Sequence, residues 1–423
     1  MNVRLVLELA PDIRSSARKK AAETFRTSSD KDLLDTLKPG VSFSHAIAVL
    51  HELIRVRAVC RSLKVGRRVL ARAIPVGEAF NIATVERRST ASYRLSRFAC
   101  LRRFQDRLIM ESPRSHTMIR FEGETLIPAV TALIKGTDAK RLGRILGNTD
   151  LGRAVIDLFS AADVLADKAE DRGDLRHWAF HDLLFHSRSR SGRQPDPYGA
   201  LPSAAKVRAA FKPPRRESVI RLTKPVDPQW PSFQQILEQR RSRRRHHAPA
   251  ITASELGEFL FYCARATRVS RTAKGIVTAF RPYPSASGAY ELEVYVAVNR
   301  CGDLDPGLYY YRPLEHQLEL VSNSPDVQLL IRNAGKAADA AAPQVLLILA
   351  ASFDRLGSRY GSIAYALTLK NVGVLIQTMY LVATAMGLAA CAIGGGNSDL
   401  FARVAELDYY KEGSVGELIL GRM

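Results

Sequence analysis

The stretch that decides the fold is residues 359–401, RYGSIAYALTLKNVGVLIQTMYLVATAMGLAACAIGGGNSDLF. It is predominantly apolar from Ile363 to Leu388, which predicts a long helix. The most apolar part, 372–386, contains a glycine and a glutamine and is shorter than the roughly 18 residues that suggest a membrane span. We therefore expect a buried core helix, followed by a glycine loop at 394–396.

The segments on either side of this helix are strand-like. Residues 291–298 alternate strictly, with Leu292, Val294, Val296 and Val298 on one face, which predicts a half-buried strand. Further strands are expected at 308–311 after the turn Asp305-Pro306-Gly307, at 344–351 and at 415–420, and a helix is expected from the capping-box spacing Thr252 to Glu255 through about Thr267. Interleaved helices and strands place this half in the α+β class.

The arginine run 240–245, RRSRRR, opens this half of the chain. Guanidinium groups present forked donors to phosphate oxygens, and the hydroxyl of Ser242 adds a short donor between them. A solvated basic face or a nucleic-acid patch explains such a run equally well in a chain with 62 Lys+Arg, 42 Asp+Glu and a net charge of +20.

Residues 187–232 hold eight of the twenty prolines and no sustained apolar period, so we expect a linker or arm there. Before it, the sequence predicts helices around 46–54, 125–135 and 151–166, and strands at 96–104 and 108–111, an arrangement compatible with winged-helix modules. The expected domains are 1–90 and 91–187, both winged-helix-like, the arm 188–232 and the main domain 233–423.

Five scattered cysteines without a CxxC pair argue against a disulfide framework and a zinc site, and favour a reducing, cytoplasmic setting. The N-terminal residues MNVRLVLELAPDIR are too short in their apolar part and too charged for a signal peptide. We therefore expect a cytoplasmic protein that does not insert in a membrane.

Five segments agree in order with a known family: EQRRSRRRH, RPYPSASGAYELEVYVAV, PGLYYYRPLEHQLELV, residues 359–401 and SVGELILG. Over 233–423 the chain resembles the SagB/ThcOx family of nitroreductase-like, FMN-dependent dehydrogenases, which oxidise azoline rings to azoles in ribosomally made peptides. The first half, through SRFACLRR, MESPRS and WAFHDLLFHSRSR, looks like the accessory region of the same family, similar to winged-helix modules that hold a precursor's leader.

The resemblance implies a set of FMN contacts. Arg240, Ser242 and Arg244 match the positions that hold the FMN phosphate. Ser285, Ala286 and Ser287 match a loop that reaches the flavin of the partner subunit, and Gly394 and Gly395 match backbone donors near flavin N5 and O4. Such a composite site implies a homodimer.

The resemblance also implies a catalytic pair, and here the chain departs from the family. Azoline dehydrogenases typically carry a Lys-Tyr pair that takes the substrate proton, whereas this chain has Arg359-Tyr360. Arginine stays charged in proteins and cannot act as an ordinary base. Tyr360 is then the candidate base, with Arg359 assisting it or orienting the substrate, and Lys370 is a weaker reserve.

Two further patterns look chemical but have simpler explanations. His177, His181 and His186 with Asp182 include a metal-compatible i, i+4 pair, but no further ligand is evident, so packing and hydrogen bonding are favoured and no metal is expected. In Tyr309-Tyr310-Tyr311, a strand would place at most alternate rings on one surface, and ordinary strand packing explains them.

The leading hypothesis is an FMN-dependent dehydrogenase that oxidises thiazoline or oxazoline rings in a precursor peptide, in complex with a cyclodehydratase and its partner protein. A second hypothesis keeps the flavin and uses NAD(P)H with a quinone or nitroaromatic acceptor. A third is a basic winged-helix protein that binds nucleic acid or a peptide leader and carries an inactive flavin fold, although an acidic leader peptide would also explain the positive charge.

Overall fold

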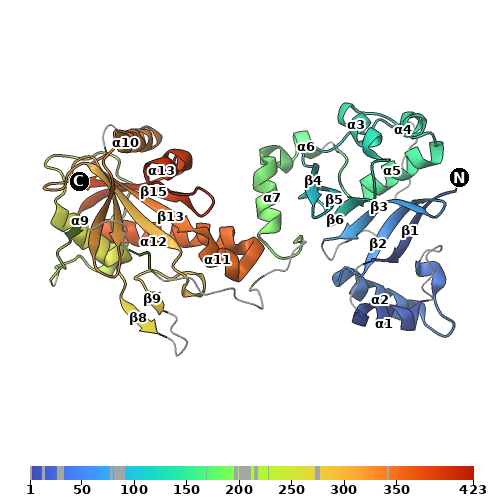
Figure 1. Ribbon diagram of the computed structural model, residues 1–423, viewed down its shortest axis with the longest axis horizontal. Helices are drawn as coiled ribbons and strands as arrows, with labels where there is room; N and C mark the ends of the chain where they lie inside the picture. The colour runs from blue at the N-terminus through green and yellow to red at the C-terminus, as the bar shows by residue number, and fades with distance from the viewer. Residues whose placement is uncertain are drawn as a thin grey trace. The chain divides into compact units, whose positions relative to one another are not determined.

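The computed structural model describes residues 2–11, 15–25, 33–76, 80, 91–167, 169–194, 199, 211–213, 218–226, 228–271, 277–340 and 343–423. The chain divides into two compact units, Met1–Pro197 and Tyr198–Met423 (Figure 1). Each unit has its own hydrophobic core.

The second unit is built on one antiparallel sheet with the strand order β14-β15-β13-β10-β11-β12-β7. Its elements are β7 (Val219–Arg221), α8 (Phe233–Gln239), α9 (Ala253–Ala264), β8 (Arg268–Arg271), β9 (Val277–Phe280), η3 (Ala286–Gly288), β10 (Leu292–Val298), β11 (Gly307–Arg312), β12 (Gln317–Ser322), α10 (Asp326–Ala337), β13 (Val345–Ser352), α11 (Phe353–Tyr360), η4 (Gly361–Ile363), α12 (Ala364–Ala385), β14 (Leu388–Ile393), α13 (Ser398–Val404) and β15 (Glu412–Arg422).

Helices cover both faces of this sheet (Figure 1). Helices α9 and α12 pack on one face, and α10 and α13 pack on the other. In β10, Leu292, Val294, Val296 and Val298 face α12 as the alternation predicts, but every residue of the strand is buried. The expectation of a half-buried strand is wrong because Tyr295 and its neighbours are covered by the second helical layer.

The core helix forms as α12 and ends three residues before the expected Leu388. Gly387 lies in the left-handed region, with φ 65°, and turns the chain directly into β14. Phe353–Ala385 is long and apolar enough to cross a membrane by length and composition, but half of its most apolar window is buried within the unit. Its buried side includes Val372, Leu375 and Met379, which pack in the core between α12 and the sheet.

The predicted arm 188–232 contributes to the second unit. Val219–Arg221 pairs with β12 as the edge strand β7, and the capping box of Ser232 and Gln235 starts α8. The expected separation of arm and main domain at residue 233 therefore needs correction. An edge position suits a proline-rich segment because an edge strand leaves one row of backbone groups unpaired.

The first unit has a six-stranded antiparallel sheet with the order β1-β2-β3-β6-β5-β4. Its elements are β1 (Val3–Leu9), α1 (Ser15–Thr24), η1 (Leu33–Thr36), α2 (Phe43–Arg55), β2 (Val59–Val65), β3 (Arg68–Pro75), β4 (Cys100–Phe104), β5 (Arg107–Glu111), β6 (Thr117–Phe121), α3 (Ile127–Lys135), α4 (Ala139–Leu146), α5 (Thr149–Ala161), α6 (Ala169–Arg172), η2 (Asp174–His177) and α7 (Phe180–Arg188).

Strands from both sides of the expected boundary at residues 90 and 91 pair in this sheet, since β3 pairs with β6. The two winged-helix-like regions are therefore not separated there. The helix expected at 151–166 ends at Ala161, because Asp163 adopts a positive φ of 47° and Leu165 bridges to Leu95.

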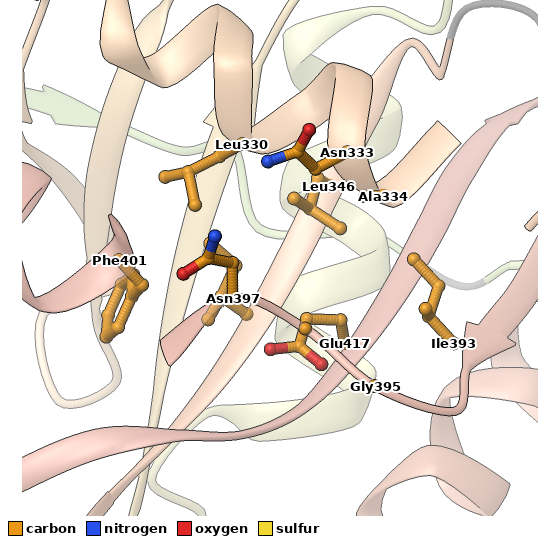
Figure 2. Close-up of a pocket in the computed structure, with 11 residues that line it drawn as sticks. Leu330, Asn333, Ala334, Leu346, Ile393, Gly395, Asn397, Phe401 and Glu417 are labelled. Carbon is orange, nitrogen blue, oxygen red and sulfur yellow. The ribbon is translucent and has the colours of Figure 1, made fainter. Parts of the chain in front are cut away.

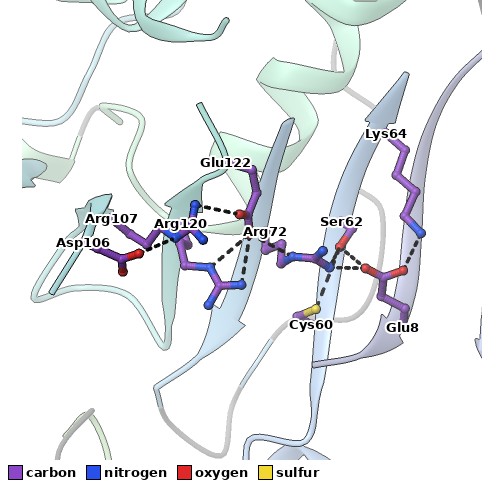
Figure 3. A network of polar contacts seen from close by, with 9 residues as sticks. All are labelled: Glu8, Cys60, Ser62, Lys64, Arg72, Asp106, Arg107, Arg120 and Glu122. Atoms are coloured by element: carbon purple, nitrogen blue, oxygen red, sulfur yellow. Dashed lines mark hydrogen bonds and ion pairs between the residues drawn. The ribbon is translucent and has the colours of Figure 1, made fainter. Parts of the chain in front are cut away.

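A network of charged side chains covers part of this sheet, and Figure 3 shows how its members pair. Glu8 accepts hydrogen bonds from Lys64 and Arg72, and Arg72 reaches Glu122 at 2.9 Å. Burial raises the pKa of the neighbouring Cys60 thiol. Paired charges on a sheet face satisfy one another's hydrogen bonds, which offsets the cost of burying them.

Candidate active site

The arginine run lies against strand β14. Helix α8 ends at Gln239, and the backbone N–H of Arg243 donates to the carbonyl of Ala390 at 2.8 Å. Arg241 turns back and donates to the carbonyl of Glu238 at 2.7 Å, whereas Arg244 is exposed. The run is therefore an extended segment fixed along the sheet edge, with exposed guanidinium groups.

Tyr380 of α12 joins this segment to the core. Its hydroxyl shares a 3.0 Å hydrogen bond with Ser242 Oγ and accepts the N–H of Ala392 at 2.7 Å. The Arg240 guanidinium lies over the Tyr380 ring, 5.5 Å from its centroid. Sequence reasoning missed Tyr380, although a tyrosine within the apolar helix was a usable signal because buried hydroxyls normally take a partner.

Gln344 fastens the chain just after the arginine run. Its side-chain amide donates to the carbonyl of His247 at 2.8 Å, and its side-chain oxygen accepts the N–H of Arg422 at 3.0 Å. The ring of His246 occupies the space that a side chain at Gly421 would need, and its Nδ1 accepts the N–H of Gln344 at 3.1 Å. Burial lowers the pKa of His246 to about 4, with Arg300 and His247 adding to the effect.

The glycine loop follows β14, which carries the chain from the arginine run to Gly394. At roughly 3.3 Å per residue, Ala390 and Gly394 are about 13 Å apart along the strand. Gly394 and Gly395 are exposed, and a Cβ at either position would meet nothing within 4 Å. Neither packing against the described residues nor a positive φ requires glycine at these two positions, so the loop backbone is open to close approach by a ligand.

Asn371 of α12 and Glu291 fix the predicted loop at 285–287. Asn371 donates to Glu291 at 2.8 Å and to Ser285 Oγ at 3.2 Å, and Ser285 Oγ donates to Glu291 at 3.1 Å. The N–H of Ala286 donates to Asn371 Oδ1 at 3.3 Å. Burial raises the pKa of Glu291, while the Asn371 hydrogen bond opposes that rise. Sequence reasoning missed both Glu291 and Asn371.

The structure brings the catalytic candidates to this loop. The hydroxyls of Tyr360 and Ser287 share a hydrogen bond, and Arg359 donates to the carbonyl of Ser287 at 3.2 Å. Ser287 adopts φ 51° and ψ 21°, a left-handed conformation that is unfavourable for serine. Such strain persists where surrounding contacts impose it and is enriched at functional sites.

A buried ion cluster supports α11, the helix that carries this pair. Arg355 contacts Glu293 at 2.7 Å and donates to the carbonyl of Tyr290 at 2.8 Å, and Tyr310 donates to Glu293 at 2.8 Å. Burial would raise the pKa of Glu293, but Arg355 and Arg281 outweigh it and hold that pKa below its usual value. These contacts join α11 to Tyr290 and Glu293, which follow the 285–287 loop in the chain.

Helix α12 links the two groups of candidates, since Asn371 contacts the 285–287 loop and Tyr380 contacts the arginine run. Nine residues of helix separate them by about 13.5 Å. The structure thus places Arg240, Ser242 and Gly394 along β14, and Ser285 to Ser287 with Arg359 and Tyr360 at the other end of α12. The structure gives no direct contact between the two groups.

The remaining patterns play no part in this site. Lys370 is exposed on α12, Tyr309 and Tyr311 face one core layer, and Tyr310 faces the other. His186 stacks with Trp178, 5.4 Å between ring centroids, and His181 is exposed beside Asp182. Within the described ranges, no group of three or more His, Cys, Asp or Glu side chains could hold a metal ion.

Two family models match the chain. The cyanobactin oxidase ThcOx model matches residues 93–195, and the nitroreductase family model matches residues 237–422. The second unit is therefore similar to the nitroreductase family over most of its length. The expected resemblance and the α+β fold class are thereby confirmed, and both families are oxidoreductases, so the chain carries oxidoreductase machinery.

The chain is also similar to individual proteins. A Methanocaldococcus jannaschii protein named for the nitroreductases is 29% identical over 164 residues, 38% of this chain and 78% of its own. A nitroreductase-type structure from Ralstonia eutropha is 23% identical, covers 53% of this chain and 98% of its own, and gives a TM-score of 0.41. The E. coli microcin synthetase McbBCD complex with truncated pro-MccB17 bound is 20% identical, covers 49% of this chain and 79% of its own, and gives 0.37.

Proposed function

We propose that this protein is an FMN-dependent dehydrogenase that oxidises thiazoline or oxazoline rings in a ribosomally made precursor peptide. The observation that carries the proposal is the pairing of a ThcOx-type segment at 93–195 with a nitroreductase domain at 237–422 in one chain. Nitroreductase-family domains typically bind flavin. The ThcOx segment narrows the reaction from flavin oxidoreduction in general to peptide oxidation.

The residues along β14 suit FMN. Arg240, Ser242 and Arg244 would hold the phosphate, because they present exposed charged and hydroxyl donors on a segment that is fixed to the sheet. Gly394 and Gly395 would let their backbone amides approach the ring closely, since no described atom lies within 4 Å of a Cβ position at either residue. FMN bound there would supply a hydride acceptor, and amide donors near its N5 and O4 would stabilise the developing negative charge.

The working unit we propose is a homodimer in which Ser285, Ala286 and Ser287 reach the flavin of the other subunit. The surface of helix α12 is consistent with such a homodimer, because Tyr365, Leu369 and Val374 on this helix are exposed apolar side chains. Between them, Gly373 has no atom within 4 Å of a Cβ position. A glycine inside a helix costs about 1 kcal/mol relative to alanine, and close approach of a second copy explains keeping it.

In the proposed reaction, the substrate loses a proton from its Cα to the Tyr360 oxygen and a hydride from the adjacent ring carbon, which yields the azole. Tyr360 is held by Ser287, and Arg359 is held by the carbonyl of the same residue. Arg359 keeps its charge and would orient the substrate or stabilise negative charge on its partner, without acting as the base. Dioxygen would return the reduced flavin to its oxidised form.

The first test is the flavin itself. Purified protein should be yellow and release about one FMN per chain, and a colourless protein that takes up no added FMN would contradict every flavin-based function. An azoline-containing peptide should then lose 2 Da per ring on turnover, measured by mass spectrometry.

Substitutions at the catalytic pair test the mechanism. Tyr360→Phe should abolish azole formation while FMN is retained, because it removes only the hydroxyl. Arg359→Lys restores the family's usual pair and should retain or raise the rate. Unchanged turnover by Tyr360→Phe would remove that hydroxyl from the reaction.

A second candidate function is reduction of a quinone or nitroaromatic with NAD(P)H, and Arg359 in place of lysine favours it. Flavin bleaching by NAD(P)H under anaerobic conditions, faster than by azoline peptide, would select this second function.

We further propose a cytoplasmic location and assembly with a cyclodehydratase and its partner protein, with the first unit holding the precursor's leader. Co-purification of those proteins tests the assembly.

A further inference from the structure

A cavity of about 270 Å³ lies behind the glycine loop, on the face of the sheet that α10 and α13 cover (Figure 2). Its walls are mostly apolar and include Leu330, Leu346, Ile348, Ile393 and Phe401. Its polar side chains are the amides of Asn333 and Asn397 and the carboxyl group of Glu417.

Glu417 occupies a position that packing alone would fill with an apolar residue. In the middle of β15 it pairs with Ile348 of β13 and Ile393 of β14, and only 6% of its surface is exposed. Burying a carboxyl group among apolar side chains is costly, so its presence there indicates a role beyond filling the core.

That role is visible at the glycine loop. A Cβ at Gly396 would overlap the carboxyl group of Glu417, so in this structure the carboxyl group fills the space directly under the loop. The next residue, Asn397, accepts the N–H of Leu400 at 2.9 Å and caps α13. The loop therefore rests on Glu417 at one point and is anchored to α13 at the following one.

We propose that Glu417 is a positioning residue for the glycine loop, its carboxyl group setting where the backbone of Gly394 and Gly395 lies. The link to catalysis rests on the proposed function, in which these amides meet the flavin. The support under the loop is a property of the flavin-free protein as well. Glu417 thus acts through the loop and not by touching the reacting atoms.

The cavity favours the neutral, protonated form of the Glu417 carboxyl group. Burial raises the pKa of Glu417, and a hydrogen bond from Ser414 partly opposes the rise. The other residues that line the cavity are not titratable, while Arg332 and Lys336 on α10 and Asp399 and Arg403 on α13 are exposed. No side chain that lines the cavity carries a positive charge to balance an ionised Glu417 carboxylate. Ionisation should therefore displace this carboxylate from under the loop, so loop order should decrease as the pH rises.

Hydrogen exchange in the flavin-free protein tests the positioning directly, with the amide protection of Leu400 and Phe401, whose N–H groups are bonded to Asn397, measured from pH 5 to 8. Wild type should lose about tenfold protection over this range, whereas Glu417→Gln should stay within twofold because it cannot ionise. Glu417→Ala, which leaves the space empty, should show tenfold lower protection throughout. The exposed Glu406→Gln should follow wild type.

FMN titration separates this inference from the proposed function. FMN Kd should rise severalfold from pH 5 to 8 in wild type and stay constant in Glu417→Gln. If wild type binds no FMN at any pH, the proposed function fails while the exchange result still decides the role of Glu417. Identical protection and identical pH profiles in wild type, Glu417→Gln and Glu417→Ala would overturn the positioning role.

Discussion

At the scale of single residues, the six positions 240–245 differ in what they can do. Arg240 lies over Tyr380 beside Ser242, whereas Arg241 is turned back to the carbonyl groups of Glu238 and Arg240. Equal charge therefore does not mean equal function. The contacts distinguish Arg240 and Ser242, which we propose bind the phosphate together with Arg244, from Arg241, which caps the end of α8.

We predict that Arg240→Ala weakens FMN binding by ten- to a hundredfold, because a hydrogen bond to a charged group contributes about 1.5–3 kcal/mol. The matched variant Arg241→Ala removes the same charge and should change the affinity less than threefold. Fluorescence titration of flavin-free protein with FMN measures both. Equal losses in the two variants would show that only net charge matters.

Much of the candidate site could be predicted from sequence, and the residues that were missed share a physical reason. The arginine run and the two loops carry their signal in local order. Tyr380, Asn371 and Glu417 signal only that each is a polar residue in an apolar element, because their roles depend on contacts with residues 138, 86 and 21 positions away. A single polar residue in an apolar helix or strand indicates a buried partner without saying which one.

At the scale of elements, the predictions that were confirmed had a long or strictly periodic signal. The core helix and the strand at 292–298 are of this kind. The exposure of that strand was wrong, since alternation shows which residues share a face and does not show that α10 and α13 cover the other one. The short edge strand β7 was missed because three residues are too few to show a period-two alternation.

The segment 246–251 fixes the arginine run through a neutral histidine, which makes the second unit sensitive to acid. Burial lowers the pKa of His246 to about 4, whereas an unfolded histidine titrates near 6.5. Between these values the unfolded state binds more protons, so stability falls as the pH falls. We predict a loss of roughly 2.5 kcal/mol from this group between pH 7.5 and 4.5.

The measurement is urea unfolding followed by the fluorescence of Trp230. This ring makes an edge-to-face contact with Tyr262 of α9, and it reports the second unit once Trp178→Phe removes the other tryptophan. His246→Asn cannot titrate and should show a correspondingly smaller loss over the same pH range. If the free energy of unfolding fell equally with pH in wild type and in His246→Asn, the acid sensitivity would not come from His246.

At the scale of the whole molecule, the two units carry different parts of the proposed activity. Residues that match the ThcOx model lie in the first unit, and residues that match the nitroreductase model make up most of the second. The second unit alone holds every candidate FMN contact, and yet its 285–287 loop lies at the far end of α12 from the arginine run. The composite site that we propose between two copies would reconcile these positions.

Gly373 offers a sharp test of that assembly. In a helix that faces water, replacing glycine stabilises the chain, since glycine costs about 1 kcal/mol in a helix interior. Where a second copy packs against α12, a leucine at the same position keeps the two helices apart. We therefore predict that Gly373→Leu converts a dimer to a monomer in sedimentation analysis and weakens FMN binding at least tenfold, because the partner's loop is lost.

The control is Gly357→Leu, at another helical glycine with open space around it, and this variant should remain dimeric. A wild-type monomer, or an unchanged dimer in Gly373→Leu, would contradict packing through this face.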